Sequence, residues 1–230
     1  MTAKEKPAKT LATTLLNVAW LSVLLGLGME ILLILAAAYF NSDNSTAAII
    51  ADAVQKISWS TLVCSGVAVG MAAGKMRPQV MGLAGLIAAP VAFYTAKVLH
   101  KSASQALAIA GQAAVGGPSP VLIVSIKALE YAALGLIIGT LSNRPSLSLW
   151  HNLLAGLLIG IVFGGTIVYL MVTMAAEPLP PLGIATRCIN EIIFPVGCSA
   201  VLFAAQKIGE KSAETTKKEA NLEREFAHEE

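Results

Sequence analysis

The sequence predicts an all-α integral membrane protein with about six transmembrane helices, and its composition carries that prediction. Hydrophobic residues make up 56% of the 230-residue chain, and charged residues make up only 13%. A soluble domain contains about 45–50% apolar and about 25% charged residues, so roughly half of the usual charge is missing. The remaining charge is uneven, because residues 210–230 hold seven of the 14 acidic and four of the 16 basic residues.

Six stretches of the chain are apolar and long enough to cross a bilayer, which takes about 20 helical residues. They cover about residues 15–40, 51–74, 79–99, 121–141, 149–174 and 182–206. We therefore expect a six-helix transmembrane domain over residues 15–206, with an outer loop over residues 100–120. A basic N-terminal segment over residues 1–14 precedes it, and a charged cytoplasmic helix over residues 207–230 follows it.

The distribution of lysine and arginine predicts the orientation of the spans, because cytoplasmic loops carry an excess of both residues. With six spans, one side holds Lys4, Lys6, Lys9, Lys75, Arg77, Arg144, Lys207, Lys211, Lys217 and Lys218. The loops over residues 41–50 and 175–181, on the other side, contain acids and no base, although Lys97 and Lys101 oppose this pattern. We expect both termini in the cytoplasm and the chain in a bacterial cytoplasmic (inner) membrane.

The outer loop over residues 102–120 has two interpretations. Residues 102–115 are small and weakly amphipathic, and the run Gly116-Gly117-Pro118-Ser119-Pro120 follows them. A short helix lying at the membrane interface is the favoured interpretation. The alternative is a re-entrant segment that lines a pore, because non-helical backbone at membrane depth is tolerated only beside water or protein.

Short motifs recur in the second, fourth and sixth spans and suggest an internal repeat. Each span places a base early, in Lys56-Ile-Ser-Trp59, Lys127-Ala-Leu-Glu130 and Arg187-Cys-Ile-Asn190. In the first two copies a glycine pair then leads to Arg77-Pro78 or to Arg144-Pro145. The pattern predicts repeated hairpins of spans two–three and four–five, with spans six and one as a divergent pair. An inverted three-plus-three repeat and a chance recurrence in glycine-rich spans are the alternatives.

Glycines spaced four residues apart share one helix face, where the missing side chains allow close contact between backbones. Three spans carry such faces, formed by Gly66, Gly70 and Gly74, by Gly135 and Gly139, and by Gly156, Gly160 and Gly164. We expect these faces to pack against other helices of the same chain. Contact between two copies of the chain is the alternative.

Ionisable residues inside the spans are the candidate functional residues. They are Glu30, Lys56, Lys127, Glu130, Arg187 and Glu191. Each would cost about 2.5–3.5 kcal/mol at a helix centre, so six unpaired charges could not be carried. With the orientation above they lie at overlapping depths in the outer half of the bilayer. Lys127 and Glu130 are spaced to share a helix face, as are Arg187 and Asn190, and Arg187 can also pair with Glu191.

Pro195 adds a backbone feature to this cluster. A proline inside a helix deprives the carbonyl group four residues earlier of its donor, and that residue is Glu191. We expect a kink that presents a free carbonyl oxygen beside the Glu191 carboxylate. Such a combination suits a cation, a proton relay or a water molecule.

Several functions are not favoured by the sequence. A net charge of +2 without basic stretches interleaved with aromatic residues does not suggest a nucleic-acid partner. The chain has no phosphate-binding loop, no zinc-protease motif and no nucleophile elbow, so we expect no enzyme. The three cysteines are unpaired in sequence and no histidine lies near them, so we expect no metal and no cofactor.

Two functional hypotheses are left. The first is a small transport or channel protein that moves protons or small ions through the charged cluster. The second is a non-catalytic structural or assembly subunit of a larger membrane complex, in which the same charges form interhelical ion pairs. The expected partners are the lipid bilayer and, for the second hypothesis above all, other membrane subunits or a homo-oligomer.

Overall fold

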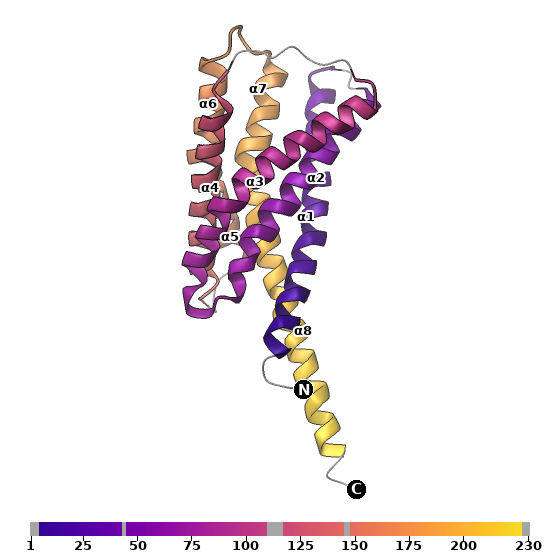
Figure 1. Ribbon diagram of the computed structural model, residues 1–230, viewed down its shortest axis with the longest axis vertical. Helices are drawn as coiled ribbons and strands as arrows, with labels where there is room; N and C mark the ends of the chain where they lie inside the picture. The colour runs from indigo at the N-terminus through magenta and orange to yellow at the C-terminus, as the bar shows by residue number, and fades with distance from the viewer. Residues whose placement is uncertain (1–4, 43–44, 110–116, 145–147, 227–230) are drawn as a thin grey trace.

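The computed structural model describes residues 5–42, 45–109, 117–144 and 148–226, and every element within these ranges is a helix (Figure 1). The α-helices are α1 (Glu5–Tyr39), α2 (Thr46–Val69), α3 (Arg77–Ala106), α4 (Pro120–Leu141), α5 (Leu149–Ile159), α6 (Gly165–Thr173), α7 (Pro181–Cys188) and α8 (Phe194–Phe226). Two short 3₁₀ turns, Gly70–Ala72 and Gly74–Met76, connect α2 to α3. Two π turns, η3 (Gly160–Gly164) and η4 (Ile189–Ile193), join α5 to α6 and α7 to α8.

Five helical stretches in the described part of the chain are long and apolar enough to cross a membrane. They are Ala12–Tyr39, Gly74–Ala106, Pro120–Leu141, Leu149–Thr173 and Pro181–Ser212. The last two each run through a π turn, so α5–η3–α6 and α7–η4–α8 are single continuous rods. The remaining long helix, α2, has 24 residues and is less apolar, because Asp52, Gln55 and Lys56 lie in its first half.

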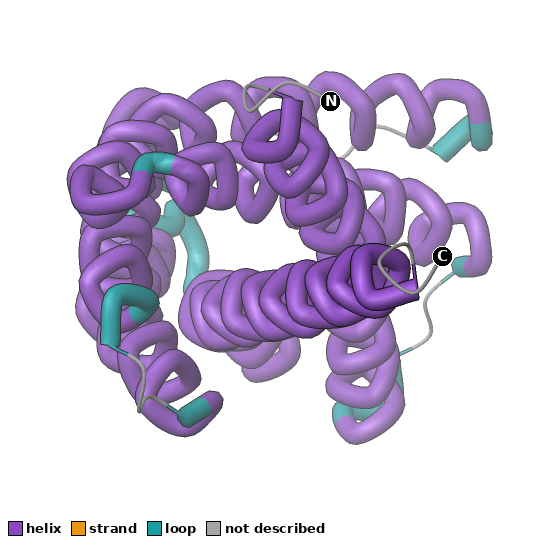
Figure 2. Tube along the Cα trace, turned by 90° about the horizontal axis from the view of Figure 1, so that it is seen from below, coloured by secondary structure: helices purple, strands orange, loops and turns teal. Residues whose placement is uncertain are grey.

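The helices form an elongated bundle with the start of α1 and the end of α8 on one side (Figure 1). We call the lower end in Figure 1, where α1 begins and α8 leaves the bundle, the terminal end, and we call the opposite end the distal end. Seen from the terminal end, α8 projects toward the viewer out of the other helices (Figure 2). Within the bundle, α1 packs against α2 and α8, α3 packs against α2 and α4, and α5 packs against α8.

Local sequence explains where several helices begin. Ser45 caps α2, because its side-chain oxygen accepts a hydrogen bond of 3.2 Å from the Ala48 amide. Ser119 caps α4 in the same way, accepting from Leu122 at 3.3 Å, and Pro120 follows at the first helical position. Together these caps satisfy helix N–H groups that would otherwise lack an acceptor at the distal end.

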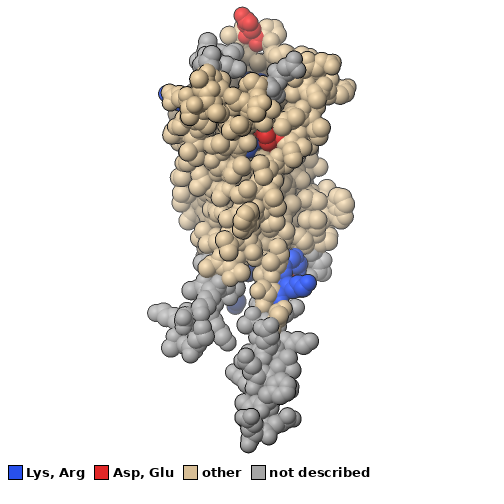
Figure 3. Space-filling view, turned by 90° about the vertical axis from the view of Figure 1, so that its right-hand side faces the viewer, with Lys and Arg blue, Asp and Glu red and all other residues tan. Residues whose placement is uncertain are grey.

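The sides of the bundle are apolar on the outside as well as the inside. Buried residues from all parts of the bundle form one core, which includes Val63, Met81, Tyr131, Leu134 and Leu202. The exposed side chains between the two ends are also large and apolar, among them Trp20, Leu24, Leu83 and Leu158. Figure 3 shows one such side, on which few charged residues lie between the two ends. An apolar exterior of this kind is suited to contact with lipid tails rather than water.

Most of the expected glycine faces lie at helix–helix contacts within the chain. Gly66 lies against Ala88 and Gly70 against Met81, both on α3, while Gly135 and Gly139 lie against Met81 and Pro78 of the same helix. The third face, Gly156, Gly160 and Gly164, lies against the backbone of η4 and the start of α8. These faces are therefore occupied within one chain.

Gly74 departs from this pattern, and its assignment to a packing face is wrong. An added Cβ at Gly74 would meet no atom within 4 Å, and the residue has a φ of +56°. Because α2 ends at Val69, Gly74 lies in the connection to α3. Its backbone there adopts the left-handed conformation that glycine takes without steric cost.

The helix boundaries also differ from the expected ones. The first helix begins at Glu5 rather than near residue 15, and the sixth continues without a break to Phe226. The third continues to Ala106, so residues 102–106 extend that helix instead of starting a separate interfacial one. Residues 110–116 and Pro145 lie outside the described residues, so the re-entrant alternative and the second Arg-Pro step of the repeat stay predictions.

Candidate functional site

A cavity of about 390 Å³ lies between α2, α3, α4 and η4 and reaches the loops at the distal end. Its charged lining residues are Lys56, Lys97, Lys127, Arg187 and Glu191. Its aromatic lining residues are Trp59, Phe93 and Phe194, and the amides Gln55 and Asn190 add neutral polar groups. Met171 of α6 also lines the cavity, which therefore brings together residues from five of the six predicted spans.

Lys127 is the most buried base in this wall and lies between two carboxylates. Its Nζ is 2.8 Å from Glu130 Oε2 and 2.7 Å from Glu191 Oε2. The Lys127, Glu130 and Glu191 side chains are 6%, 0% and 15% exposed, so Glu191 is the member of the triad nearest to solvent. The Lys127 ammonium also lies 5.8 Å from the Trp59 ring centre and 5.7 Å from that of Tyr131, within the range of cation–π attraction.

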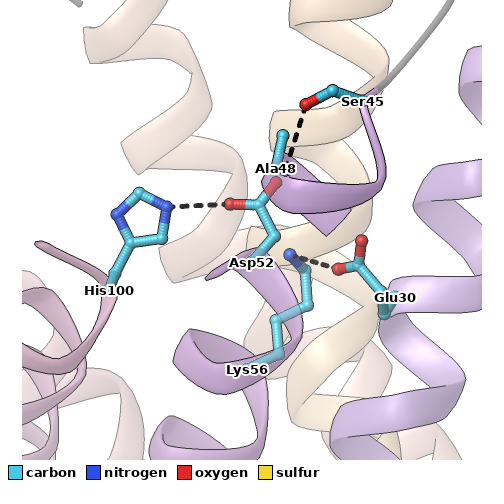
Figure 4. Close-up of polar contacts among 6 residues, drawn as sticks. All are labelled: Glu30, Ser45, Ala48, Asp52, Lys56 and His100. Carbon is cyan, nitrogen blue, oxygen red and sulfur yellow. Dashed lines mark hydrogen bonds and ion pairs between the residues drawn. The ribbon is translucent and has the colours of Figure 1, made fainter. Parts of the chain in front are cut away.

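A second buried ion pair joins α1 to α2. Glu30 Oε2 is 2.8 Å from Lys56 Nζ, and the two side chains are 8% and 11% exposed (Figure 4). This pair joins two of the predicted charged residues, one from the first predicted span and one from the second. One helical turn from Lys56, toward the distal end, Asp52 Oδ1 lies 3.0 Å from Nε2 of His100 on α3. The Asp52–His100 contact was not expected from the sequence, and both side chains are partly exposed.

Arg187 does not pair with Glu191, which corrects the i,i+4 ion pair that their spacing allowed. Its Nη1 donates instead to the Gly183 carbonyl oxygen at 2.7 Å, and Arg187 makes no ion pair within the described part of the chain. Helical side chains point toward the N-terminus of their helix, which for α7 is the distal end. Arg187 follows that direction, while Glu191 is held by Lys127. Asn190, one turn after Arg187, also lines the cavity.

The backbone around Pro195 takes the form of a π turn, which the sequence did not predict. The π turn Ile189–Ile193 precedes the buried Pro195 and contains both Asn190 and Glu191. A proline cannot donate to the carbonyl group four residues earlier, and a π turn likewise departs from the regular hydrogen-bond pattern of an α-helix. The Glu191 carbonyl oxygen lies so close to Gly164 that a Cβ there would overlap it. Gly160 and Gly164 of the other π turn thus allow the Glu191 backbone to approach closely.

Polar side chains continue from the triad toward the middle of the bundle. Glu130 Oε1 and the Tyr131 hydroxyl are buried and have no hydrogen-bond partner among the described residues. Deeper in the core, Cys64 Sγ of α2 lies 3.1 Å from Cys198 Sγ of α8. In the described residues no group of three or more His, Cys, Asp or Glu side chains is arranged to hold a metal ion.

Sequence reasoning missed the aromatic part of the site. Trp59 lies one helical turn after Lys56, and Tyr131 follows Glu130 directly, so both were adjacent to residues already chosen. Phe194 packs edge-on against Trp59, with ring centres 6.2 Å apart. Lys97, which was only an exception to the charge pattern, lies over the Phe93 ring at 4.7 Å. An aromatic residue one turn from an intramembrane base was the available signal.

Comparison of the chain with protein-family models, with curated proteins and with solved structures found no match.

Proposed function

We propose that the chain crosses the membrane six times, with the terminal end in the cytoplasm and with α2 as a span in addition to the five long apolar helices. The 24 residues of α2 give it a length of about 36 Å, enough for a hydrocarbon core of about 30 Å. Its low hydropathy comes partly from Lys56, which points into the bundle and does not meet lipid. Six crossings also agree with the first and last described residues lying on one side (Figure 1).

The charge distribution supports the cytoplasmic orientation of the terminal end. Arg77 Nη1 donates to the Ser142 carbonyl oxygen at 3.3 Å, which brings the start of α3 to the end of α4. Lys207, with its partner Glu210, lies on α8 toward the same end of the bundle. Bases that are concentrated in the short loops at one end of a helical bundle are typical of the cytoplasmic side.

Within this topology, the protein is a small transport or channel protein whose pathway begins at the distal cavity. The observation that supports this most directly is the Lys127–Glu130–Glu191 triad in the cavity wall. Intramembrane ionisable residues are costly, and those beside a cavity commonly mark ion or proton pathways. Glu191 borders the cavity and Glu130 lies behind it, so these two carboxylates are the proposed proton or ion sites, with Lys127 as their counter-charge.

The test is charge movement by the purified protein. Protein reconstituted in liposomes on a solid-supported membrane should give currents after a jump in the concentration of protons, of sodium or of a small organic anion such as benzoate. Glu191→Gln removes one ionisable group of the triad while keeping the side chain's size, so we expect the current to fall severalfold. Glu210→Gln, an exposed site at the terminal end, is the matched control and should keep the wild-type current.

A structural or assembly role is the second candidate, and the ion pairs themselves favour it. Each acid of the cluster lies within 3 Å of a lysine, at 2.8 Å for Glu30 and Glu130 and at 2.7 Å for Glu191, as in a network that holds helices together. On this hypothesis no current is seen, Glu191→Gln lowers the yield of folded protein, and mild-detergent purification brings stoichiometric partners. A monomeric preparation that conducts would exclude it.

A further inference from the structure

The charges that line the distal cavity are not balanced. Four bases face it, namely Lys56, Lys97, Lys127 and Arg187, but Glu191 is the single acid among the described lining residues. Glu30 and Glu130 pair with Lys56 and Lys127 without lining the cavity. Even when these two acids are counted, four bases face three acids, and the surplus positive charge lies at the cavity surface.

Two of the four bases, Arg187 and Lys97, have N–H groups that no described residue accepts from and that can bind a ligand. Arg187 uses one N–H group on the Gly183 carbonyl oxygen and makes no other hydrogen bond in the described part of the chain. A guanidinium group has five N–H donors in a planar fork that matches a carboxylate. The Lys97 ammonium rests on the Phe93 ring and forms no ion pair with a described residue. Neither base has a carboxylate partner among the described residues, and both border the cavity.

The rest of the wall is apolar and aromatic. Trp59, Phe93 and Phe194 contribute rings, and Ile123, Met171 and Leu179 contribute aliphatic surface. A volume of about 390 Å³ is large for a bare inorganic ion. Sites for small organic ligands span about 300–1,000 Å³ and combine apolar walls with a few polar groups.

We propose that the cavity binds a small organic anion, with Arg187 and Lys97 contacting its carboxylate and the rings of Trp59, Phe93 and Phe194 contacting its apolar part. This inference deepens the proposed transport function by naming the class of solute that enters the pathway, and it rests on the same site. A cation would meet an excess of like charge at the cavity surface, whereas an anion is attracted there.

Trp59 offers a direct reporter of this charge preference. The other two tryptophans, Trp20 and Trp150, are 66% and 71% exposed on the outside of the bundle. In a Trp20→Phe/Trp150→Phe background, the remaining fluorescence comes from the cavity wall. The protein is kept in uncharged dodecyl maltoside micelles, and iodide, caesium and acrylamide serve as anionic, cationic and neutral quenchers. Each quenching constant is normalised to that of free tryptophan amide.

We expect acrylamide to reach Trp59 and the normalised iodide constant to exceed the caesium constant by at least about threefold, because a positive potential concentrates anions. Benzoate should protect Trp59 from iodide, and benzylamine should not. Arg187→Gln combined with Lys97→Gln should bring the iodide-to-caesium ratio close to one. Lys75→Gln combined with Lys207→Gln removes the same charge from the terminal end and should leave the ratio unchanged. Thermal unfolding checks that each variant is folded.

Three results would overturn the proposal. Caesium quenching as strong as iodide quenching would show that the cavity does not prefer anions. Absence of quenching by acrylamide would show that the cavity is closed to solutes. Protection by phosphatidylglycerol in place of benzoate would assign the site to a lipid headgroup. Quenching can be measured without transport, so the two proposals can fail separately. A clear iodide preference without liposome currents would contradict the transport function alone. Currents without an iodide preference would contradict only the proposed binding of an organic anion.

Discussion

Burial decides what each lysine contributes to this protein. Lys127 and Glu130 are three residues apart and 2.8 Å from each other, and so are Lys207 and Glu210. The first pair is almost fully buried, whereas the second is about half exposed. Removing one member of a buried pair leaves a charge in a medium that cannot solvate it, while an exposed pair contributes little. The two pairs therefore form a matched comparison within one chain.

We predict that Lys127→Met lowers the free energy of unfolding by about 3–5 kcal/mol, because two buried carboxylates lose their only cationic neighbour within the triad. Lys207→Met should lower it by less than about 1 kcal/mol. Unfolding by sodium dodecyl sulfate, followed by circular dichroism, measures both. Adding Glu130→Gln and Glu191→Gln to Lys127→Met should restore most of the stability. Equal losses for the two lysine variants would contradict the buried triad.

At the scale of helices, the two π turns determine where Glu191 lies. The backbone of η4 contacts η3 through Gly160 and Gly164, and the carbonyl oxygens of Ile192 and Glu191 occupy the space where side chains would be. Gly165 is the next residue along the chain and has open space at its Cβ position, with no atom within 4 Å. Neighbouring glycines thus meet opposite environments.

These environments predict stability changes of opposite sign. Gly164→Ala should cost about 1–3 kcal/mol, because its methyl group would overlap backbone that cannot move independently of η4. Gly165→Ala should stabilise by up to about 1 kcal/mol, because alanine favours helix and nothing is displaced. Thermal unfolding in detergent micelles compares the two. A Gly164→Ala variant as stable as wild type would contradict the close contact between η3 and η4.

For the whole molecule, the proposed topology predicts which fusions are active in bacterial cells. A green fluorescent protein fused after Glu230 should fluoresce, because the proposed topology assigns the C-terminus to the cytoplasm, whereas alkaline phosphatase at the same place should be inactive. Alkaline phosphatase fused after Glu177, in the distal loop, should be active because the fifth span leads outward. An inactive Glu177 fusion together with an active C-terminal one would reverse the orientation. Activity of phosphatase at both places would contradict a membrane crossing by α7–η4–α8 between them.

Much of the helical architecture was predictable from composition and length alone. Long apolar stretches with few charges can satisfy their backbone groups in lipid only as helices or closed barrels, and their lengths of 20 residues or more favour helices. The glycine spacing likewise identified real contact faces, except at Gly74, because residues four apart share a helix side wherever the helix continues. Boundaries were less predictable, since α1 and α8 extend past the apolar stretches into polar sequence.

The candidate site was predictable as a set of residues, but among its ion pairs only Lys127–Glu130, three residues apart, was predictable from spacing. The cost of charge in lipid picked out Glu30, Lys56, Lys127, Glu130, Arg187 and Glu191 without any structure. Tertiary structure decided that Glu191 meets Lys127 on another helix instead of Arg187 on its own, and that Trp59 and Tyr131 cover the ammonium. It also decided that the bases, more than the acids, face a cavity. The physical reason is that the free energy of transfer from water into lipid is a property of each side chain. Pairing depends instead on which helices lie side by side and on the depth of each side chain in the bundle.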